Sequence, residues 1–240
     1  MNKTYLYPYS AEEARRRNEM SLWRASHKAN LACKEEIELA IGTHFDGTHL
    51  EEGCAEGVIR EYGYKRVQWV LSHTIQQLDW SDRFSQANKE WARQTYIPKD
   101  RAHVTDLIIV SDPAIVDLFA TQFQCAYQEL GLFGPNQCEP NSFEKLDYEG
   151  KVLVLSPDTL KESYWNARAQ LWYAHDGFGC SPHASGRAIY ATCLGDGERT
   201  RWNRGDFIGI LQDECFPEWA KQTVDTLRKA EQEAHDGISS

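Results

Sequence analysis

The chain has 240 residues, enough for one large domain or two small ones. Its residues are 41% hydrophobic and 26% charged, which excludes a disordered chain, and its net charge of −10 argues against a general binder of nucleic acid or of anionic membranes. The seven cysteines are widely spaced and form no Cys-x-x-Cys pair, so we predict free thiols in a cytoplasmic protein. No stretch approaches the roughly 20 apolar residues that a membrane span needs, so no span is predicted.

Residues 1–130 are predicted to form a mainly helical domain. Ser10 and Glu13 have the spacing of a capping box, and apolar residues then recur at intervals of three and four. The expected helices cover 11–17, 21–41, 51–61 and 65–80, and Ser81 is expected to cap another that ends before Pro98. Residues 104–110 are rich in β-branched side chains and are either a strand or an extended lead into the next helix.

The clearest amphipathic helix is predicted at 113–130, with Asp112 as its cap, Pro113 in its first turn and Gly131 at its end. Residues 131–150 mix Gly, Pro and Asn without periodicity, which predicts a linker.

Residues 151–240 are predicted to form a small α+β domain with a C-terminal helix. Strands are expected at 151–157, 171–179 and 187–194, and the Gly195-Asp196-Gly197 turn indicates a hairpin to the returning strands on either side of Gly205. The final helix is expected over 216–234. The predicted fold class is therefore α+β, with a helical N-terminal part followed by a small mixed α/β part that holds an antiparallel sheet.

Several stretches resemble a domain family of unknown function. They are YPYSAEEA, ASHKANLACKEEIE, DGTHL, VLSHTIQ and FSQANKEWA in the N-terminal half, and KVLVLSPDTL, GFGCSPHASGRAIYATCLGDGE and RGDFIGIL in the C-terminal half. The family that these stretches resemble occurs in proteins carried on conjugative and other mobile elements of gut Gram-positive anaerobes. The resemblance implies a cytoplasmic accessory protein of mobile DNA, and it implies no reaction.

One candidate site for chemistry lies in the C-terminal half. Cys180 and His183 occupy a loop rich in Gly, Ser and Pro, and a thiol nucleophile needs a base and an orienting acid, here Asp206 or Glu198. This pattern predicts a thiol-dependent hydrolase or nucleic-acid-processing enzyme over 175–206; the alternative is an inert surface thiol. His175 with Cys180 and His183 is a weaker metal candidate because the paired ligand spacings are absent, so we predict no metal and no cofactor.

Two further groups of polar residues stand out. Arg187, Arg201, Trp202 and Arg204 form a local basic patch with aromatic residues, which predicts a binding surface; the alternative is arginines that simply face solvent. Four polar residues interrupt apolar helical faces in the N-terminal half, and they either share a cleft or hydrogen-bond between helices. These four are His27, Asn30, His73 and Asn88.

No motif specifies a reaction, so the function predicted first is that of a non-catalytic interaction protein of a mobile element. Inhibition of host defence, of the anti-restriction or anti-CRISPR type, is its concrete form. A protein partner is expected. Nucleic acid remains an option through the basic patch, although the net charge disfavours it, and no membrane partner is expected. A small-ligand or nucleotide sensor, with its ligand at the junction of the two domains, is a further alternative.

Overall fold

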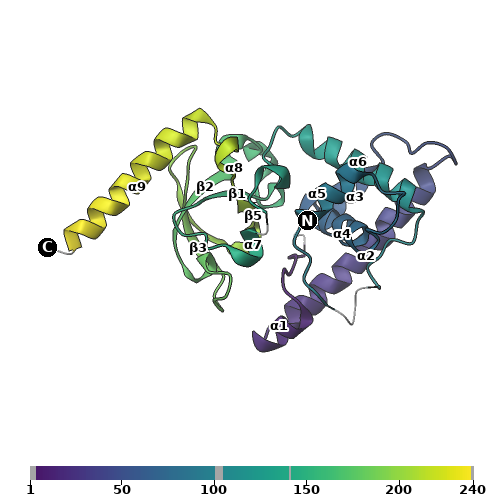
Figure 1. The fold of residues 1–240 in the computed structure, drawn as a ribbon, viewed down its shortest axis with the longest axis horizontal. Helices are drawn as coiled ribbons and strands as arrows, with labels where there is room; N and C mark the ends of the chain where they lie inside the picture. Colours follow the sequence, from purple (N-terminus) through teal and green to yellow (C-terminus); the bar gives the residue numbers. More distant parts are fainter. Residues whose placement is uncertain (1–3, 101–104, 141, 239–240) are drawn as a thin grey trace. The chain divides into compact units, whose positions relative to one another are not determined.

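The computed structural model describes residues 4–100, 105–140 and 142–238. The chain divides into two compact units, residues 1–131 and 132–240, which are described separately below. Figure 1 shows that helices make up the first unit and that the second contains the sheet. The predicted α+β class is confirmed, with its helical N-terminal part and its antiparallel sheet in the C-terminal part.

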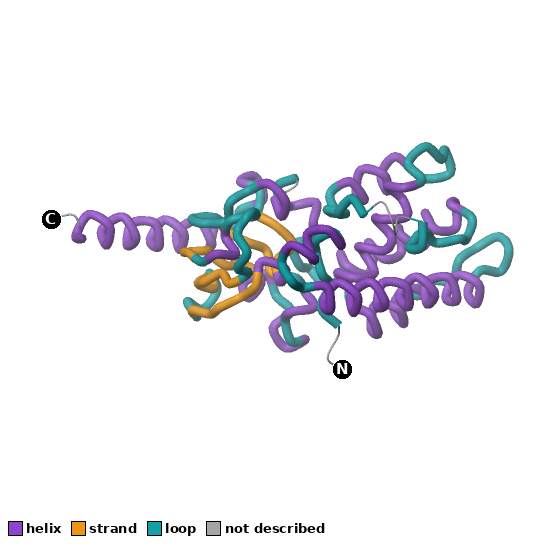
Figure 2. The backbone as a smooth tube through the Cα atoms, turned by 90° about the horizontal axis from the view of Figure 1, so that it is seen from below, coloured by secondary structure: helices purple, strands orange, loops and turns teal. Residues whose placement is uncertain are grey.

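The first unit is a group of packed helices (Figures 1 and 2). Their bounds are α1 Ala11–Arg16, α2 Met20–His44, α3 Cys54–Tyr62, α4 Tyr64–Gln77, α5 Gln86–Arg93 and α6 Pro113–Gln128. Helix α4 lies at the centre of the unit, because nearly every residue along it is buried. A helix that is buried all round packs against neighbours on several sides, and α4 contacts α2, α3, α5 and α6.

The helix boundaries follow local capping chemistry. The Asp112 side chain accepts a hydrogen bond from the backbone N–H of Ala114, with Pro113 in the first turn of α6, as the sequence predicts. Helix α5 begins later than expected, at Gln86. Its cap is Ser85, whose hydroxyl accepts from the Asn88 N–H, whereas Ser81 lies in the preceding turn.

The segment rich in β-branched residues before α6 does not form a strand where the structure describes it, so it is the extended lead into the helix. Its described part, residues 105–110, forms a turn and then an irregular run to the helix cap. The Thr74 hydroxyl on α4 accepts from the backbone N–H of Ile109 at 3.1 Å, so a side chain satisfies this N–H in place of a neighbouring strand. Leu107 and Ile109 are buried, which explains the apolar composition.

The second unit is built on a five-stranded antiparallel sheet in the order β4-β3-β2-β1-β5. The strands are β1 Val152–Leu155, β2 Leu171–Asp176, β3 Ala188–Cys193, β4 Arg199–Asn203 and β5 Phe207–Ile210. The Gly195–Gly197 segment connects β3 to β4 as a hairpin, as predicted. Short helices α7 Ser142–Lys145 and α8 Ala167–Gln170 precede β1 and β2, and α9 Glu218–Ile238 ends the chain.

Each face of the sheet carries its own hydrophobic cluster. One cluster includes Ala220 and Val224 of α9, so this helix covers that face. The other includes Cys180 and Tyr148, with Trp202 packed against it. Residues 132–150 of the predicted linker are packed into the second unit. Cys138 forms a β-bridge with Leu211, and α7 contacts β5.

Candidate functional site

The thiol predicted as a nucleophile lies in the core of the second unit. Cys180 ends a short 3-10 helix, Phe178–Cys180, and its side chain is buried in a hydrophobic cluster. Burial, with the nearby carboxylates of Asp147 and Glu149, raises the pKa of the thiol to about 12, and the Arg204 guanidinium offsets this only in part. At neutral pH the thiol is therefore protonated and a poor nucleophile.

The residues proposed to activate this thiol have other partners. The His183 side chain is exposed, and among the described residues its ring forms no hydrogen bond with the Cys180 thiol. The Asp206 carboxylate accepts from the Asn203 backbone N–H at 2.7 Å, which caps the 3-10 turn before β5. Glu198 accepts from the Thr200 hydroxyl at 3.0 Å. The structure does not bring these side chains together as a nucleophile, base and acid.

His175, considered as a metal ligand, belongs to a hydrogen-bonded chain on the sheet. Its Nδ1 lies 2.5 Å from a carboxylate oxygen of Glu231 on α9, and its Nε2 lies 2.6 Å from the Thr192 hydroxyl. The Tyr173 hydroxyl donates to the other Glu231 oxygen at 2.7 Å. In the described part of the chain, no group of three or more His, Cys, Asp or Glu side chains is placed to hold a metal ion.

The predicted basic patch divides into buried and exposed members. Arg204 is buried, and its guanidinium donates at distances of 2.6–3.1 Å to the backbone carbonyls of Ser142, Phe143, Leu146, Gly179 and Cys180. It also lies 3.7 Å above the Tyr148 ring. These contacts give Arg204 a structural role, because its charged hydrogen bonds connect the segment around α7 with the short helix Phe178–Cys180.

Trp202 packs edge-to-face on Trp172, with ring centroids 5.1 Å apart, and so belongs to the core. Arg201 is exposed on β4 and lies opposite Tyr190 of β3, whose side chain is 51% exposed. Arg187 is half-buried beside the same strand.

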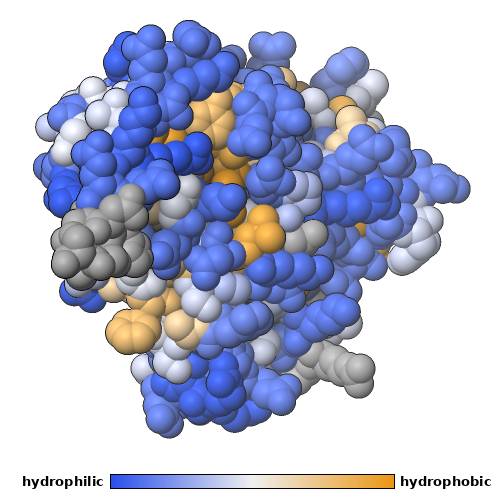
Figure 3. Space-filling model, turned by 60° about the vertical axis from the view of Figure 1, so that its left-hand side comes forward, coloured by the Kyte–Doolittle hydropathy of each residue, from blue (hydrophilic) through white to orange (hydrophobic). Residues whose placement is uncertain are grey.

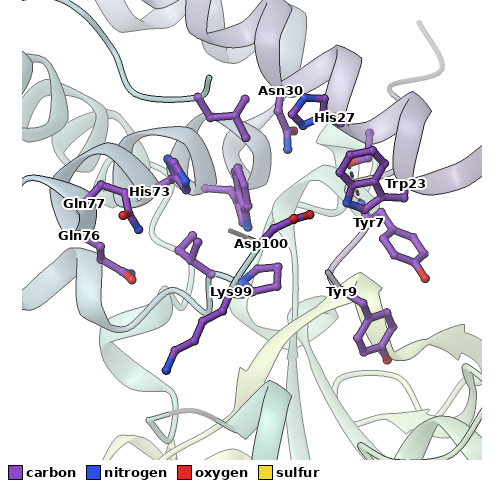
Figure 4. A pocket seen from close by; sticks show the side chains of 15 residues that line it. Tyr7, Tyr9, Trp23, His27, Asn30, His73, Gln76, Gln77, Lys99 and Asp100 are labelled. Atoms are coloured by element: carbon purple, nitrogen blue, oxygen red, sulfur yellow. Dashed lines mark hydrogen bonds between the residues drawn. The ribbon is translucent and has the colours of Figure 1, made fainter. Parts of the chain in front are cut away.

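The first unit contains a pocket of about 310 Å³. Figure 4 shows that its walls come from α2, α4, the N-terminal segment with Tyr7 and Tyr9, and the segment that follows α5. The lining residues are Tyr7, Tyr9, Trp23, Ser26, His27, Asn30, Trp69, His73, Gln76, Gln77, Ile97, Pro98, Lys99, Asp100 and Leu107. The pocket thus gathers His27, Asn30 and His73, three of the four polar residues that interrupt apolar helical faces.

Asn88 is the exception among the four. Its amide donates to Asp117 and Thr121 on α6, and its carbonyl oxygen accepts from Gln124, so it connects two helices. Both alternatives drawn from the sequence therefore occur, a shared cleft for three residues and interhelical bonding for one.

Two Trp–His pairs line the pocket, and in each pair the two rings are stacked and nearly parallel. Trp23 and His27 on α2 have ring centroids 4.9 Å apart and planes inclined by 7°. Trp69 and His73 on α4 are 5.4 Å apart and inclined by 17°. In both helices the tryptophan precedes the histidine by four residues, a spacing that places the two rings on one helical face. The repeated Trp-x-x-x-His spacing is the feature of the sequence that could have indicated this pocket, which composition and charge do not indicate.

The α4 stack contains two buried polar atoms without hydrogen-bond partners among the described residues, Trp69 Nε1 and His73 Nδ1. His73 is 3% exposed and Trp69 is 9% exposed. Burial lowers the pKa of His73 to about 4, so its imidazole is neutral at pH 7. An unsatisfied buried polar group costs roughly 1–3 kcal/mol.

Neighbouring groups set which end of each amide faces the pocket. The buried guanidinium of Arg66 donates to Asn30 Oδ1, and since arginine has only donors, the Asn30 NH₂ group is the end left to donate. The Gln76 NH₂ group donates to the carbonyls of Ala92 at 2.7 Å and Thr95 at 2.9 Å, which leaves its Oε1 as an acceptor. The pocket therefore presents both a fixed donor and a fixed acceptor.

One carboxylate faces the cavity. Figure 4 shows Asp100 directed toward the Trp23 and His27 side of the pocket, while Lys99 points away from it. One Asp100 oxygen, Oδ2, accepts from the backbone N–H of Ala11 at 3.1 Å. Tyr7 is held at the pocket by its N–H bond to the Ser26 hydroxyl at 2.9 Å, and its own hydroxyl donates to Glu19 at 2.7 Å.

Comparison with known proteins places this pocket inside a recognised domain. No curated protein and no solved structure matches the chain. A family model described as a protein of unknown function (DUF3849) matches residues 6–128, just over half of the 240 residues. The matched segment includes every residue that lines the pocket and ends before the second unit. The chain therefore belongs to this DUF3849 family, whose function is not established.

Proposed function

We propose that this protein is a non-catalytic recognition protein that binds a small guest in the pocket of its N-terminal unit. The observation that carries the proposal is that the flat rings of two Trp–His stacks line one cavity together with the polar side chains of Asn30, Gln76 and Asp100. Binding pockets are typically concave and largely aromatic, with a few polar groups that fix the orientation of the guest. On the face drawn in Figure 3, hydrophobic residues lie in small groups among hydrophilic ones.

The test is a blocked pocket. Gln77 is an exposed residue at the pocket rim, and Gln77→Trp is expected to fill the entrance without disturbing the core. Gln86→Trp is the matched control, because Gln86 is also an exposed helical glutamine but lies outside the pocket. Native mass spectrometry after incubation with the small-molecule fraction of a bacterial extract should show a bound species with wild type and Gln86→Trp, and not with Gln77→Trp. Equal occupancy in all three proteins would reject the pocket as the binding site.

A second binding function is proposed for the second unit. Tyr190 on β3 is 51% exposed, and the exposed Arg201 lies opposite it on β4. Exposed aromatic and arginine side chains are the types that most often supply binding energy at protein interfaces. This surface is where we propose that a protein partner docks.

The matched variants for this surface are Tyr190→Ser and Tyr164→Ser, since Tyr164 is similarly exposed, at 54%. A partner bound by wild type and Tyr164→Ser should be lost from Tyr190→Ser in pull-downs. Retention by Tyr190→Ser would exclude this surface.

The finer form of the proposal follows the sequence resemblance. It is a cytoplasmic accessory role in a mobile genetic element, with inhibition of restriction or CRISPR defence by protein binding as its concrete version. The thiol-dependent enzyme is the weaker alternative because the Cys180 thiol is buried. No helix of the described residues is long and apolar enough to cross a membrane. Expression in a restricting bacterial host should raise the transformation efficiency of unmodified plasmid, and the same efficiency with and without the protein would count against inhibition of restriction.

A further inference from the structure

The pocket walls have the shape of a site for a flat ring. The Trp23–His27 stack on α2 and the Trp69–His73 stack on α4 both line the same cavity, and in each stack the two rings are nearly parallel. Indole and imidazole faces stack on planar heteroaromatic guests with little dependence on the identity of the ring. A volume of about 310 Å³ lies at the lower end of the range for ligand pockets, which suits a small ring system with a short substituent.

The polar atoms around the walls match the edge of such a ring. A donor is available from the Asn30 NH₂ group, which Arg66 orients. Acceptors are available from Gln76 Oε1 and from the Asp100 carboxylate. A nucleobase presents donors and acceptors side by side on one edge, and proteins read such edges with amide and carboxylate side chains.

The charge of the pocket argues against an anionic guest. Asp100 is the charged side chain directed into the cavity, and Lys99 points away from it (Figure 4). The nearby Arg66 guanidinium lies behind Asn30 and already donates to Asn30 and to two backbone carbonyls. Phosphate groups are normally held by arginine, lysine or backbone N–H groups at a helix start, and a carboxylate would repel them. The Asp100 carboxylate is instead a suitable acceptor for ring N–H or sugar hydroxyl groups.

We propose that the pocket binds an uncharged nucleobase, free or as its nucleoside, stacked against the Trp–His pairs and read at its edge by Asn30, Gln76 and Asp100. This inference rests on the proposed recognition function and names the class of guest for the same pocket.

The test uses the full chain and commercial probes. Adenine, guanine, cytosine and uracil, their nucleosides, the nucleoside 5′-monophosphates, and choline as an organic cation are titrated by calorimetry into wild type. At least one nucleobase or nucleoside should bind saturably, and the corresponding monophosphate should bind at least tenfold more weakly at low salt. Binding of choline alone, of monophosphates in preference to nucleosides, or of none of these probes would overturn the nucleobase assignment.

Variants locate the site. Trp23→Ala, which removes one stacking face, should weaken nucleoside binding at least tenfold, while Trp23→Phe should recover most of the affinity. Gln77→Trp should abolish binding and Gln86→Trp should leave it unchanged. If the native extract yields a species that Gln77→Trp excludes but no nucleobase or nucleoside binds, the recognition function stands and the nucleobase assignment falls. If Gln77→Trp changes neither experiment, both proposals fall.

Discussion

The buried environment of His73 changes its titration. The side chain is 3% exposed, and burial lowers its pKa to about 4 from an ordinary 6.5. Between those two pH values the unfolded chain binds a proton at this histidine and the folded chain does not. Because the unfolded state then binds more protons, the stability of the fold falls as the pH is lowered from 6.5 toward 4. The full loss is about 3 kcal/mol, from about 1.4 kcal/mol per pH unit.

His73→Phe keeps a flat ring and removes this titration. We expect the difference in unfolding free energy between wild type and His73→Phe to change by about 3 kcal/mol between pH 7 and pH 4. Chemical denaturation at several pH values measures it. The carboxylates titrate in both proteins, so a difference that stays constant over this window would show that His73 is not buried as a neutral imidazole.

The cysteines should differ sharply in reactivity. Cys180 is buried and its thiol has a pKa of about 12, whereas Cys125 on α6 is exposed. The thiolate is the reactive form, so native protein treated with iodoacetamide near pH 7.5 should be alkylated at Cys125 well before Cys180. Peptide mass spectrometry over time gives both rates. Faster labelling of Cys180 than of Cys125 would support the alternative hypothesis of a thiol-dependent enzyme.

At the scale of elements, the end of β2 requires a glycine. Gly177 has φ +119°, and a Cβ atom there would lie 2.3 Å from the carbonyl oxygen of Ala188 at the start of β3. Gly197 in the β3–β4 hairpin also has a positive φ, +79°, but a Cβ atom there meets nothing within 4 Å.

Both Gly177→Ala and Gly197→Ala carry the strain of a positive φ, and only Gly177→Ala adds a clash with backbone. The clash should make Gly177→Ala less stable than Gly197→Ala by about 1–3 kcal/mol, the usual cost of overpacking. Urea denaturation of the two variants tests this. Equal stabilities would mean that β2 and β3 separate easily at this point.

Element positions were largely predictable because their signals are local. The cap and first turn of α6 at Asp112 and Pro113, and the β3–β4 hairpin at Gly195–Gly197, depend only on neighbouring residues. The start of α5 was misplaced because Ser81 and Ser85 are equally good caps by residue type. Which of the two caps the helix depends on the packing around them, and the Asp117 carboxylate on α6 accepts from both the backbone N–H and the hydroxyl of Ser85.

At the scale of the whole molecule, two compact units predict two unfolding events in the full chain. Arg204 supplies a specific test of the second unit. Arg204→Met removes the donor for the carbonyls of Ser142, Phe143, Leu146, Gly179 and Cys180. Leaving these buried carbonyls without their charged partner should destabilise the second unit by about 3–5 kcal/mol.

Calorimetry of the full chain should show one transition lowered in Arg204→Met and the other unchanged, and hydrogen exchange should assign the lowered transition to residues 132–240. Arg201→Met is the matched control, since Arg201 is exposed, and it should change stability by about 0.5 kcal/mol or less. A single transition that shifts as a whole in Arg204→Met would show that the two units unfold together.

The sequence by itself determined the fold class, most element positions and the set of polar residues that needed an explanation. Periodicity and capping act over a few neighbouring residues, so they can be read along the chain. The tertiary structure alone decided the use of the polar residues. Arg204, predicted to lie on a binding surface, is buried among carbonyls, and His27, Asn30 and His73 meet Asp100 in one pocket. These partners lie far apart in sequence, and burial and charge environment arise only when packing brings them together.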